Sequence, residues 1–139
     1  MDFRMQTFLP YPDFLKSARV LDNKRLGKQR VEVLQLVLGQ FLDHPASKMW
    51  RGYRDALIDY GLAVCKVWTR ERGFSDTVKD KLLEHVSLSD EVRMPPWLGN
   101  PEFHASHRSN LLRKDFLCYS RYGWTEGPDL PYIWPESDK

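Results

Sequence analysis

The chain has 139 residues, of which 42% are hydrophobic and 13% aromatic, so it has the size and apolar content of one compact domain spanning residues 1–139. Its formal net charge of only +2 excludes binding to a polyanion through overall charge, so such binding would need local clusters of its 21 basic residues. The longest apolar stretch, from Val31 to Leu42, is interrupted by Glu32, Gln35 and Gln40, which excludes a membrane-spanning helix.

The first element is expected to be extended. Gln6 to Leu9 is short, mixed in polarity and stopped by Pro10, a pattern typical of one strand or of an extended arm packed against helices. Asp13 is a suitable cap for a short helix that runs to about Val20.

A longer helix is expected from Asp22, its cap, through Leu42, and the pair His44 and Pro45 ends it. Its apolar side chains recur at helical spacing and predict one buried face. They are Leu26, Val33, Leu34, Val37 and Phe41.

A second long helix is predicted by apolar spacing from Ser47 to about Arg72, with Gly73 as a left-handed terminator. A short helix from Asp76 to His85 follows, and then a polar connector over residues 87–93.

The C-terminal part combines a loop, a helix and a tail. The prolines of residues 94–101 exclude regular helix, so we expect an ordered loop pinned by Trp97, followed by a helix from Pro101 or Glu102 to about Lys114. The Pro-rich tail is expected to be a strap whose rings close over the core. The sequence therefore predicts a mainly α fold: a single compact domain of three to five helices with a short N-terminal extended segment and an aromatic, Pro-rich C-terminal strap.

The cysteines and histidines give little sign of a disulfide or a metal site. Cys65 and Cys118 are expected to be buried thiols without a disulfide, because a lone pair in a chain with no signal-peptide-like start is typical of reducing, cytoplasmic surroundings. The 4 histidines lack zinc-site spacing, although His104 and His107 are separated by one helical turn.

The segment from Phe103 to Trp124 interleaves cations, hydroxyls and rings, with Asp115 as its single carboxylate. Cations neutralise phosphates and rings stack on unpaired bases, so this mixture is typical of a nucleic-acid surface. A solvated helix followed by an aromatic core plug fits the pattern equally well. The candidate phosphate contacts are Ser106, Arg108, Arg113, Lys114 and Arg121, and the candidates for stacking in a pocket are Tyr119, Tyr122 and Trp124.

A second basic cluster, residues 24–30, lies in the first long helix. Helical spacing places Arg25, Lys28, Gln29 and Glu32 on one face, so a single carboxylate stands among cations. An ordinary surface pair between Lys28 and Glu32 is the alternative interpretation. The candidate DNA contacts of this cluster are Lys24, Arg25, Lys28 and Arg30.

Several segments occur together in a recognisable order and spacing: residues 5–10, 21–32, 94–99 and 119–123, with His104, Ser106 and Leu112 along the last helix. This pattern resembles the pyrimidine dimer DNA glycosylase family, the phage-type endonuclease V, and is most similar to its bacterial branch of small proteins. Glu32 stands where that family carries its catalytic glutamate, on the first long helix. The residues at 119–123 resemble its aromatic C-terminal segment.

The resemblance implies a DNA repair glycosylase with AP-lyase activity that acts on pyrimidine dimers in double-stranded DNA and requires no metal or other cofactor. In that chemistry the N-terminal α-amine attacks the sugar C1′ of the damaged nucleotide, displaces the base and forms an imine, and β-elimination then cuts the strand. An α-amine suits this role because its unperturbed pKa, about 7.7 to 8.0, leaves free base at neutral pH. The resemblance also implies that Glu32 is an electrostatic stabiliser and proton carrier near the sugar.

The nucleophile and one contact depart from the family pattern. The residue after either possible start is too large to favour removal of the methionine, so the amine would belong to a retained Met1 or Met5. Val31 stands where the family carries an arginine, so that contact is absent unless Arg25 or Arg30 replaces it.

His104 and His107 are candidates for the lesion pocket, and a buried histidine that holds the loop of Pro95 and Pro96 is the alternative. Two rival functions remain open: a non-catalytic DNA-binding protein that keeps the fold, and a metal-dependent nuclease that uses both histidines with a carboxylate. We expect a monomer in the cytoplasm, associated with the nucleoid.

Overall fold

Helices make up most of the chain. The computed structural model describes residues 5–87 and 91–135. Its helices are α1 (Phe14–Val20), α2 (Asn23–Val37), α3 (Pro45–Met49), α4 (Arg54–Lys66), α5 (Val78–Leu83), α6 (Pro101–Lys114) and α7 (Phe116–Tyr119), with a π-helical turn η1 (Val67–Glu71) and a 3₁₀ turn η2 (Ser120–Tyr122). No strand occurs in these ranges. The predicted mainly α fold is confirmed, and the short helices bring the α-helices of the described residues to seven, where three to five were expected.

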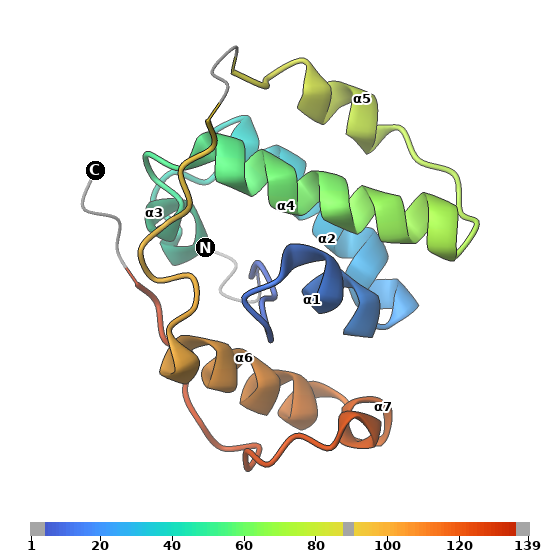
Figure 1. Ribbon diagram of the computed structural model, residues 1–139, viewed down its shortest axis with the longest axis vertical. Coiled ribbons are helices and arrows are strands. Elements are labelled where there is room, and N and C mark those ends of the chain that lie inside the picture. Colours follow the sequence, from blue (N-terminus) through green and yellow to red (C-terminus); the bar gives the residue numbers. More distant parts are fainter. Residues whose placement is uncertain (1–4, 88–90, 136–139) are drawn as a thin grey trace.

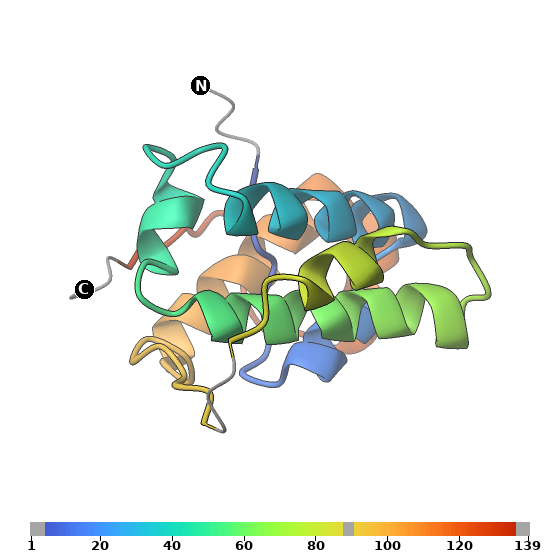
Figure 2. The same cartoon turned by 90° about the horizontal axis from the view of Figure 1, so that it is seen from above.

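The helices form two layers. In one layer α2 and α4 pack side by side, α1 packs against α4, and α5 packs against both (Figure 1). The second layer is α6, which continues into α7 below the first layer in Figure 1 and behind it in Figure 2. The N-terminal extended segment runs between the layers.

Helices α1 and α2 begin at the predicted capping residues, and α5 and α6 also begin next to a capping side chain. The side chains of Asp13, Asp22 and Asn100 accept hydrogen bonds from the first-turn amides of α1, α2 and α6. Asp76 accepts from the amides of Val78 and Lys79 and so starts α5.

α2 ends at Val37, earlier than the predicted Leu42. Gly39 adopts a φ of 76°, a left-handed conformation that stops an α-helix. Phe41 therefore does not continue the buried stripe and is exposed, as is Leu42.

The predicted helix from Ser47 to Arg72 is broken into α3 and α4. Gly52 has a φ of 85°, so the chain turns there before α4 begins at Arg54. At the other end, Gly73 has a φ of 75° and terminates the π-helical turn, as the sequence predicted for the helix.

Gly61 allows α4 to approach its neighbours closely. A Cβ atom at this position would lie 2.7 Å from Cγ1 of Val33 on α2 and 2.8 Å from Cδ1 of Leu82 on α5. The glycine is therefore required where the three helices meet.

The N-terminal segment is extended and buried, but its hydrogen-bond partners are side chains rather than a neighbouring strand. The side-chain amide of Gln29 on α2 donates to the carbonyl of Gln6 (2.6 Å) and accepts from the amide of Phe8 (2.6 Å). On the other side, the amide of Leu9 donates to Nδ1 of His107 on α6 (3.0 Å). The segment thus joins the two layers.

The loop and the strap follow the prediction. Trp97 is buried and its indole donates to the carbonyl of Met49 (2.9 Å), which pins the proline-containing loop. In the strap, Tyr132 and Trp134 lie edge-on to His107 and His44. None of the helices in the described part of the chain has the length and apolar character of a membrane span.

Both thiols are free. Cys65 is buried as expected, whereas Cys118 is only half-buried.

Candidate functional site

A pocket of about 220 Å³ brings the two basic clusters of the sequence together around one carboxylate. We call it the Glu32 pocket, and its lining residues are Phe8, Lys24, Arg25, Lys28, Glu32 and Lys114. The cations come from α2 and from the end of α6, which are distant in sequence. Glu32 is only 7% exposed, whereas Lys24 and Lys28 are exposed.

The helical spacing of α2 explains most of this arrangement. Arg25, Lys28 and Glu32 share the predicted face and line the pocket. Gln29, expected on the same face, is instead fully buried, because it binds the N-terminal segment that lies across α2. Phe8 of that segment completes the lining.

Glu32 is close enough to the buried Tyr60 to act on its ionisation. Burial raises the pKa of Tyr60, and the negative charge of Glu32 raises it further. Tyr60 in turn lies under the N-terminal segment, with its hydroxyl donating to the carbonyl of Phe8 (2.7 Å). Tyr60 therefore lies near the carboxylate and also bonds to the N-terminal segment.

The surroundings of Glu32 define what the pocket can do chemically. A poorly solvated carboxylate can accept or return a proton and can stabilise a positive charge that develops nearby. The surrounding cations can attract phosphate groups. The pocket thus holds a group suited to proton transfer beside groups suited to binding a polyanion.

Sequence reasoning found Glu32, the cations and the position of Gln29 on their face, but it missed Phe8 and the bonds that Gln29 makes. Gln29 lies one helical turn before Glu32, and Phe8 lies in the predicted extended arm. The spacing of Gln29 was visible, but nothing in the sequence indicated that its amide would bind the backbone of residues 6 and 8.

Tyr119 does not line the pocket but bonds to Asp22, which positions the lining residue Arg25. It is fully buried, its hydroxyl donates to Asp22 Oδ1, and Arg25 forms an ion pair with the same carboxylate (3.0 Å). Burial favours a higher pKa for Asp22, but the hydroxyl of Tyr119 and the guanidinium of Arg25 outweigh it and lower that pKa. Asp22 therefore caps α2 as a carboxylate and positions Arg25.

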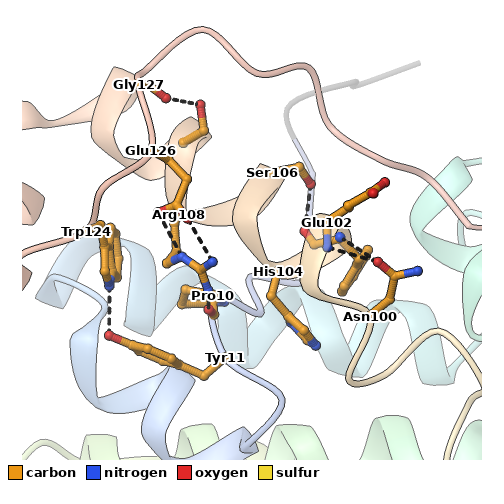
Figure 3. Close-up of polar contacts among 12 residues, drawn as sticks. Pro10, Tyr11, Asn100, Glu102, His104, Ser106, Arg108, Trp124, Glu126 and Gly127 are labelled. Carbon is orange, nitrogen blue, oxygen red and sulfur yellow. Dashed lines mark hydrogen bonds and ion pairs between the residues drawn. The ribbon is translucent and has the colours of Figure 1, made fainter.

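The other predicted stacking residues form an aromatic cluster with Tyr119. Trp124 is stacked on Tyr119, with ring centroids 5.9 Å apart, and Tyr122 is tilted against both. The indole of Trp124 also donates to the hydroxyl of Tyr11 (2.8 Å), as Figure 3 shows. All three rings are at least half-buried, which matches the core-plug alternative.

Arg108, predicted as a phosphate contact, is engaged within the protein. Its guanidinium donates to both carboxylate oxygens of Glu126 (2.9 Å each) and to the carbonyl of Pro10 (2.7 Å), as seen in Figure 3. It therefore ties the strap to the N-terminal segment.

Three other predicted DNA contacts also have intramolecular partners. Ser106 is buried, donates to the carbonyl of Phe103 (2.7 Å) and accepts from the amide of Ile133 (3.2 Å). Arg30 pairs with Asp76 and lies over the ring of Trp68, on a different side of α2 from the pocket. Arg113 donates to Asn110 and to the carbonyl of Pro128 (3.3 Å).

Arg121 remains largely exposed, and its Nε donates to the carbonyl of Cys118 (2.7 Å).

The histidines predicted for the lesion pocket are buried between the layers. His104 Nδ1 lies 2.7 Å from the carbonyl of Leu9, and its Nε2 accepts from the amide of Gly99 (2.9 Å). His107 accepts from the amide of Leu9. Neither lines the Glu32 pocket, and His104 holds the proline-containing loop as the alternative interpretation had it. No group of three or more potential ligand side chains for a metal occurs among the described residues.

Arg30 does not supply the arginine contact that is absent at Val31, since its guanidinium pairs with Asp76. Arg25 does line the pocket. Met5 is described and buried at the start of the extended segment, whereas Met1 lies outside the described residues.

Comparison with known proteins gives a family match. The model of a family described as pyrimidine dimer DNA glycosylase matches residues 5–82, more than half of the chain. No curated protein and no solved structure matches. The matched region contains the extended segment, α1, α2 and Glu32, whereas Lys114 and α7 lie beyond it.

Proposed function

This chain belongs to the pyrimidine dimer DNA glycosylase family, and on that premise we propose that it removes damaged pyrimidines, pyrimidine dimers above all, from double-stranded DNA and then cuts the strand as an AP lyase. The observation that carries the proposal is the nearly buried Glu32 in a pocket whose other polar lining residues are cations. We further propose that one domain spans the whole chain and acts as a monomer.

The proposed nucleophile is the N-terminal α-amine. Its lone pair forms a bond to C1′ while the glycosidic bond breaks, and the base leaves with the bonding electrons and acquires a proton. Opening of the sugar ring gives an imine, which acidifies the proton on C2′. Removal of that proton expels the 3′ phosphate and cuts the strand.

Two methionines are candidates to provide the amine. If the chain begins at Met5, the amine stands one residue before Gln6, whose carbonyl is held by Gln29, and Gln29 lies one turn from Glu32 on α2. If it begins at Met1, the amine lies outside the described residues. A protein that starts at Met5 and one that starts at Met1 can be compared directly.

Glu32 is proposed as the group that moves protons near the sugar. Its low exposure weakens solvent screening, so its charge acts strongly on an imine cation or on a proton at the departing base. The surrounding cations keep a carboxylate favourable there.

Lys24, Arg25, Lys28 and Lys114 are proposed as the contacts to DNA phosphates, because they line the same pocket as Glu32. Arg113 and Arg121 are exposed at the same end of α6 and α7 and are proposed as further contacts. The intramolecular bonds of Ser106, Arg108 and Arg30 support a structural role for those residues instead.

Borohydride trapping tests this proposal. Reduction of an imine links the protein covalently to DNA, so DNA with an abasic site or a pyrimidine dimer should give a crosslinked species with the wild-type protein. Glu32→Gln should reduce trapping about 100-fold or more, and chemical blocking of the N-terminal amine should abolish it. Glu84→Gln, at the exposed end of α5, is the matched control and should trap normally. Trapping that survives a blocked terminus would mean that an internal lysine is the nucleophile.

A non-catalytic DNA-binding protein is the second candidate function. The exposed Val31, which stands at a position where an arginine was expected, favours it. That candidate predicts salt-sensitive DNA binding without any trapped species, so the same experiment separates the two.

A further inference from the structure

Two adjacent apolar side chains project from the start of α7. Leu117 is 90% exposed and Phe116 is 59% exposed, and Leu117 is the most exposed large hydrophobic side chain in the described part of the chain. Scattered exposed apolar residues are ordinary, but a neighbouring pair of this size is costly to hydrate. The position of this pair and the anchored backbone that carries it indicate that it contacts a binding partner.

The backbone that carries the pair is held on both sides. The carboxylate of Asp115 accepts from the amide of Cys118 (3.2 Å) and caps α7. Tyr119, directly after this turn, is fully buried and bound to Asp22, and Arg121 donates to the carbonyl of Cys118 (2.7 Å). The two apolar side chains are thus presented on an anchored turn.

The pair follows a lining residue of the Glu32 pocket closely in the chain. Lys114, one of the lining residues, is two residues before Phe116, and the bond from Tyr119 to Asp22 fixes α7 beside the first turn of α2, where Lys24 and Arg25 lie. Figure 1 shows α7 at the end of the molecule where α2 begins. This end of the molecule therefore carries several of the pocket cations and an apolar projection.

We propose that Phe116 and Leu117 form a wedge that enters the base stack of duplex DNA beside the damaged nucleotide and fills the space left when a base is unstacked. The inference rests on the proposed function, since it assigns the pair to the same DNA-bound state. Apolar wedges stabilise unstacked and kinked duplexes because they cover base faces that would otherwise meet water. Duplex DNA suits this surface better than a second copy of the chain, since the cations around the pair would repel their equivalents in the copy and attract phosphates.

The test uses duplexes with 2-aminopurine beside or opposite the damaged site, because the fluorescence of this base rises when it is unstacked. Wild-type protein should raise the fluorescence, and the double variant Phe116→Ala with Leu117→Ala should lose most of that rise and bind the damaged duplex about tenfold more weakly. Leu117→Met, which keeps an apolar side chain of similar length, should behave like the wild type. Leu42→Ala is the matched control, because Leu42 is also exposed, at 61%, but lies beyond the other end of α2.

A single-stranded substrate separates the wedge from a general contact. It has no opposite strand to hold apart, so the double variant should process a single-stranded damaged oligonucleotide as the wild type does. Equal losses on single strands and duplexes, unchanged fluorescence, or a wild-type dimer that the variant dissociates would each overturn the wedge. If the wild type binds but never excises a base, the proposed function fails while the fluorescence result still decides the wedge.

Discussion

His107 is held neutral by its position between the two layers. Burial, together with a smaller effect of the neighbouring His104, lowers the pKa of its imidazole from the ordinary 6.5 to about 3. Its Nδ1 accepts the amide proton of Leu9, which only the neutral ring can do. The residue is therefore an acceptor for the backbone of the N-terminal segment, and its protonation is linked to folding.

Folding should become less favourable as the pH falls below 6.5, because the unfolded chain then takes up a proton that the native ring does not bind. The loss should continue down to about pH 3, where the native imidazole also protonates. Between pH 7 and pH 5 we expect a decrease of about 2 kcal/mol in the free energy of unfolding. Urea unfolding at both pH values measures it.

His107→Asn is the control for this pH effect. The Asn Oδ1 can take the place of Nδ1 as acceptor for Leu9 but does not titrate. This variant should be less stable at pH 7 and yet lose less stability on going to pH 5. An unchanged pH dependence would assign the effect to other groups, His104 first among them.

At the scale of helices, Gly61 governs how α2, α4 and α5 meet. In an exposed helix, Gly→Ala stabilises by about 1 kcal/mol. Here the added methyl group would press on Val33 and Leu82, so we expect Gly61→Ala to destabilise the protein by about 1–3 kcal/mol. Val33→Ala removes one of the contacting groups, so the cost of Gly61→Ala should be smaller in that background. A double-mutant cycle of urea unfolding measures this coupling, and additive losses would contradict it.

Helix starts with an aspartate cap, at Asp13 and Asp22, could be predicted from the sequence, whereas the end of α2 and the break before α4 could not. A cap is a local signal, since the side chain of Asp22 or Asn100 bonds to an amide within its own first turn. Gly39 and Gly52 end or break helices because their φ angles are positive in the fold, and the sequence indicated such an angle at Gly73 but not at these two positions. Gly61 has the same residue type and lies inside a continuous helix.

The site was predictable to the extent that it follows the period of one helix. Arg25, Lys28 and Glu32 meet in one pocket because of helical spacing. Lys114 joins them through tertiary packing, which the sequence does not reveal. Packing also decides that Arg108 binds Glu126 rather than facing solvent. From the sequence alone, an arginine and a glutamate are both expected at an exposed surface.

At the scale of the whole molecule, the small net charge of +2 makes DNA affinity depend on where the cations lie. Lys28 lines the Glu32 pocket, whereas Lys66 is an exposed lysine in the last turn of α4 that does not line it. Replacing either by glutamine changes the net charge equally. If binding follows the pocket, Lys28→Gln should make the slope of log K against log salt less negative by about 0.9, the value for one phosphate contact.

Lys66→Gln should leave that slope nearly unchanged, and both slopes can be measured by fluorescence anisotropy on one duplex across a series of salt concentrations. Lys24→Gln should match Lys28→Gln, since both lysines are exposed at the pocket. Sequence preference should not change, because a phosphate contact carries no base information. Equal slopes for Lys28→Gln and Lys66→Gln would mean that DNA binds through diffuse charge, and the pocket would then lose its assignment as the DNA-facing surface.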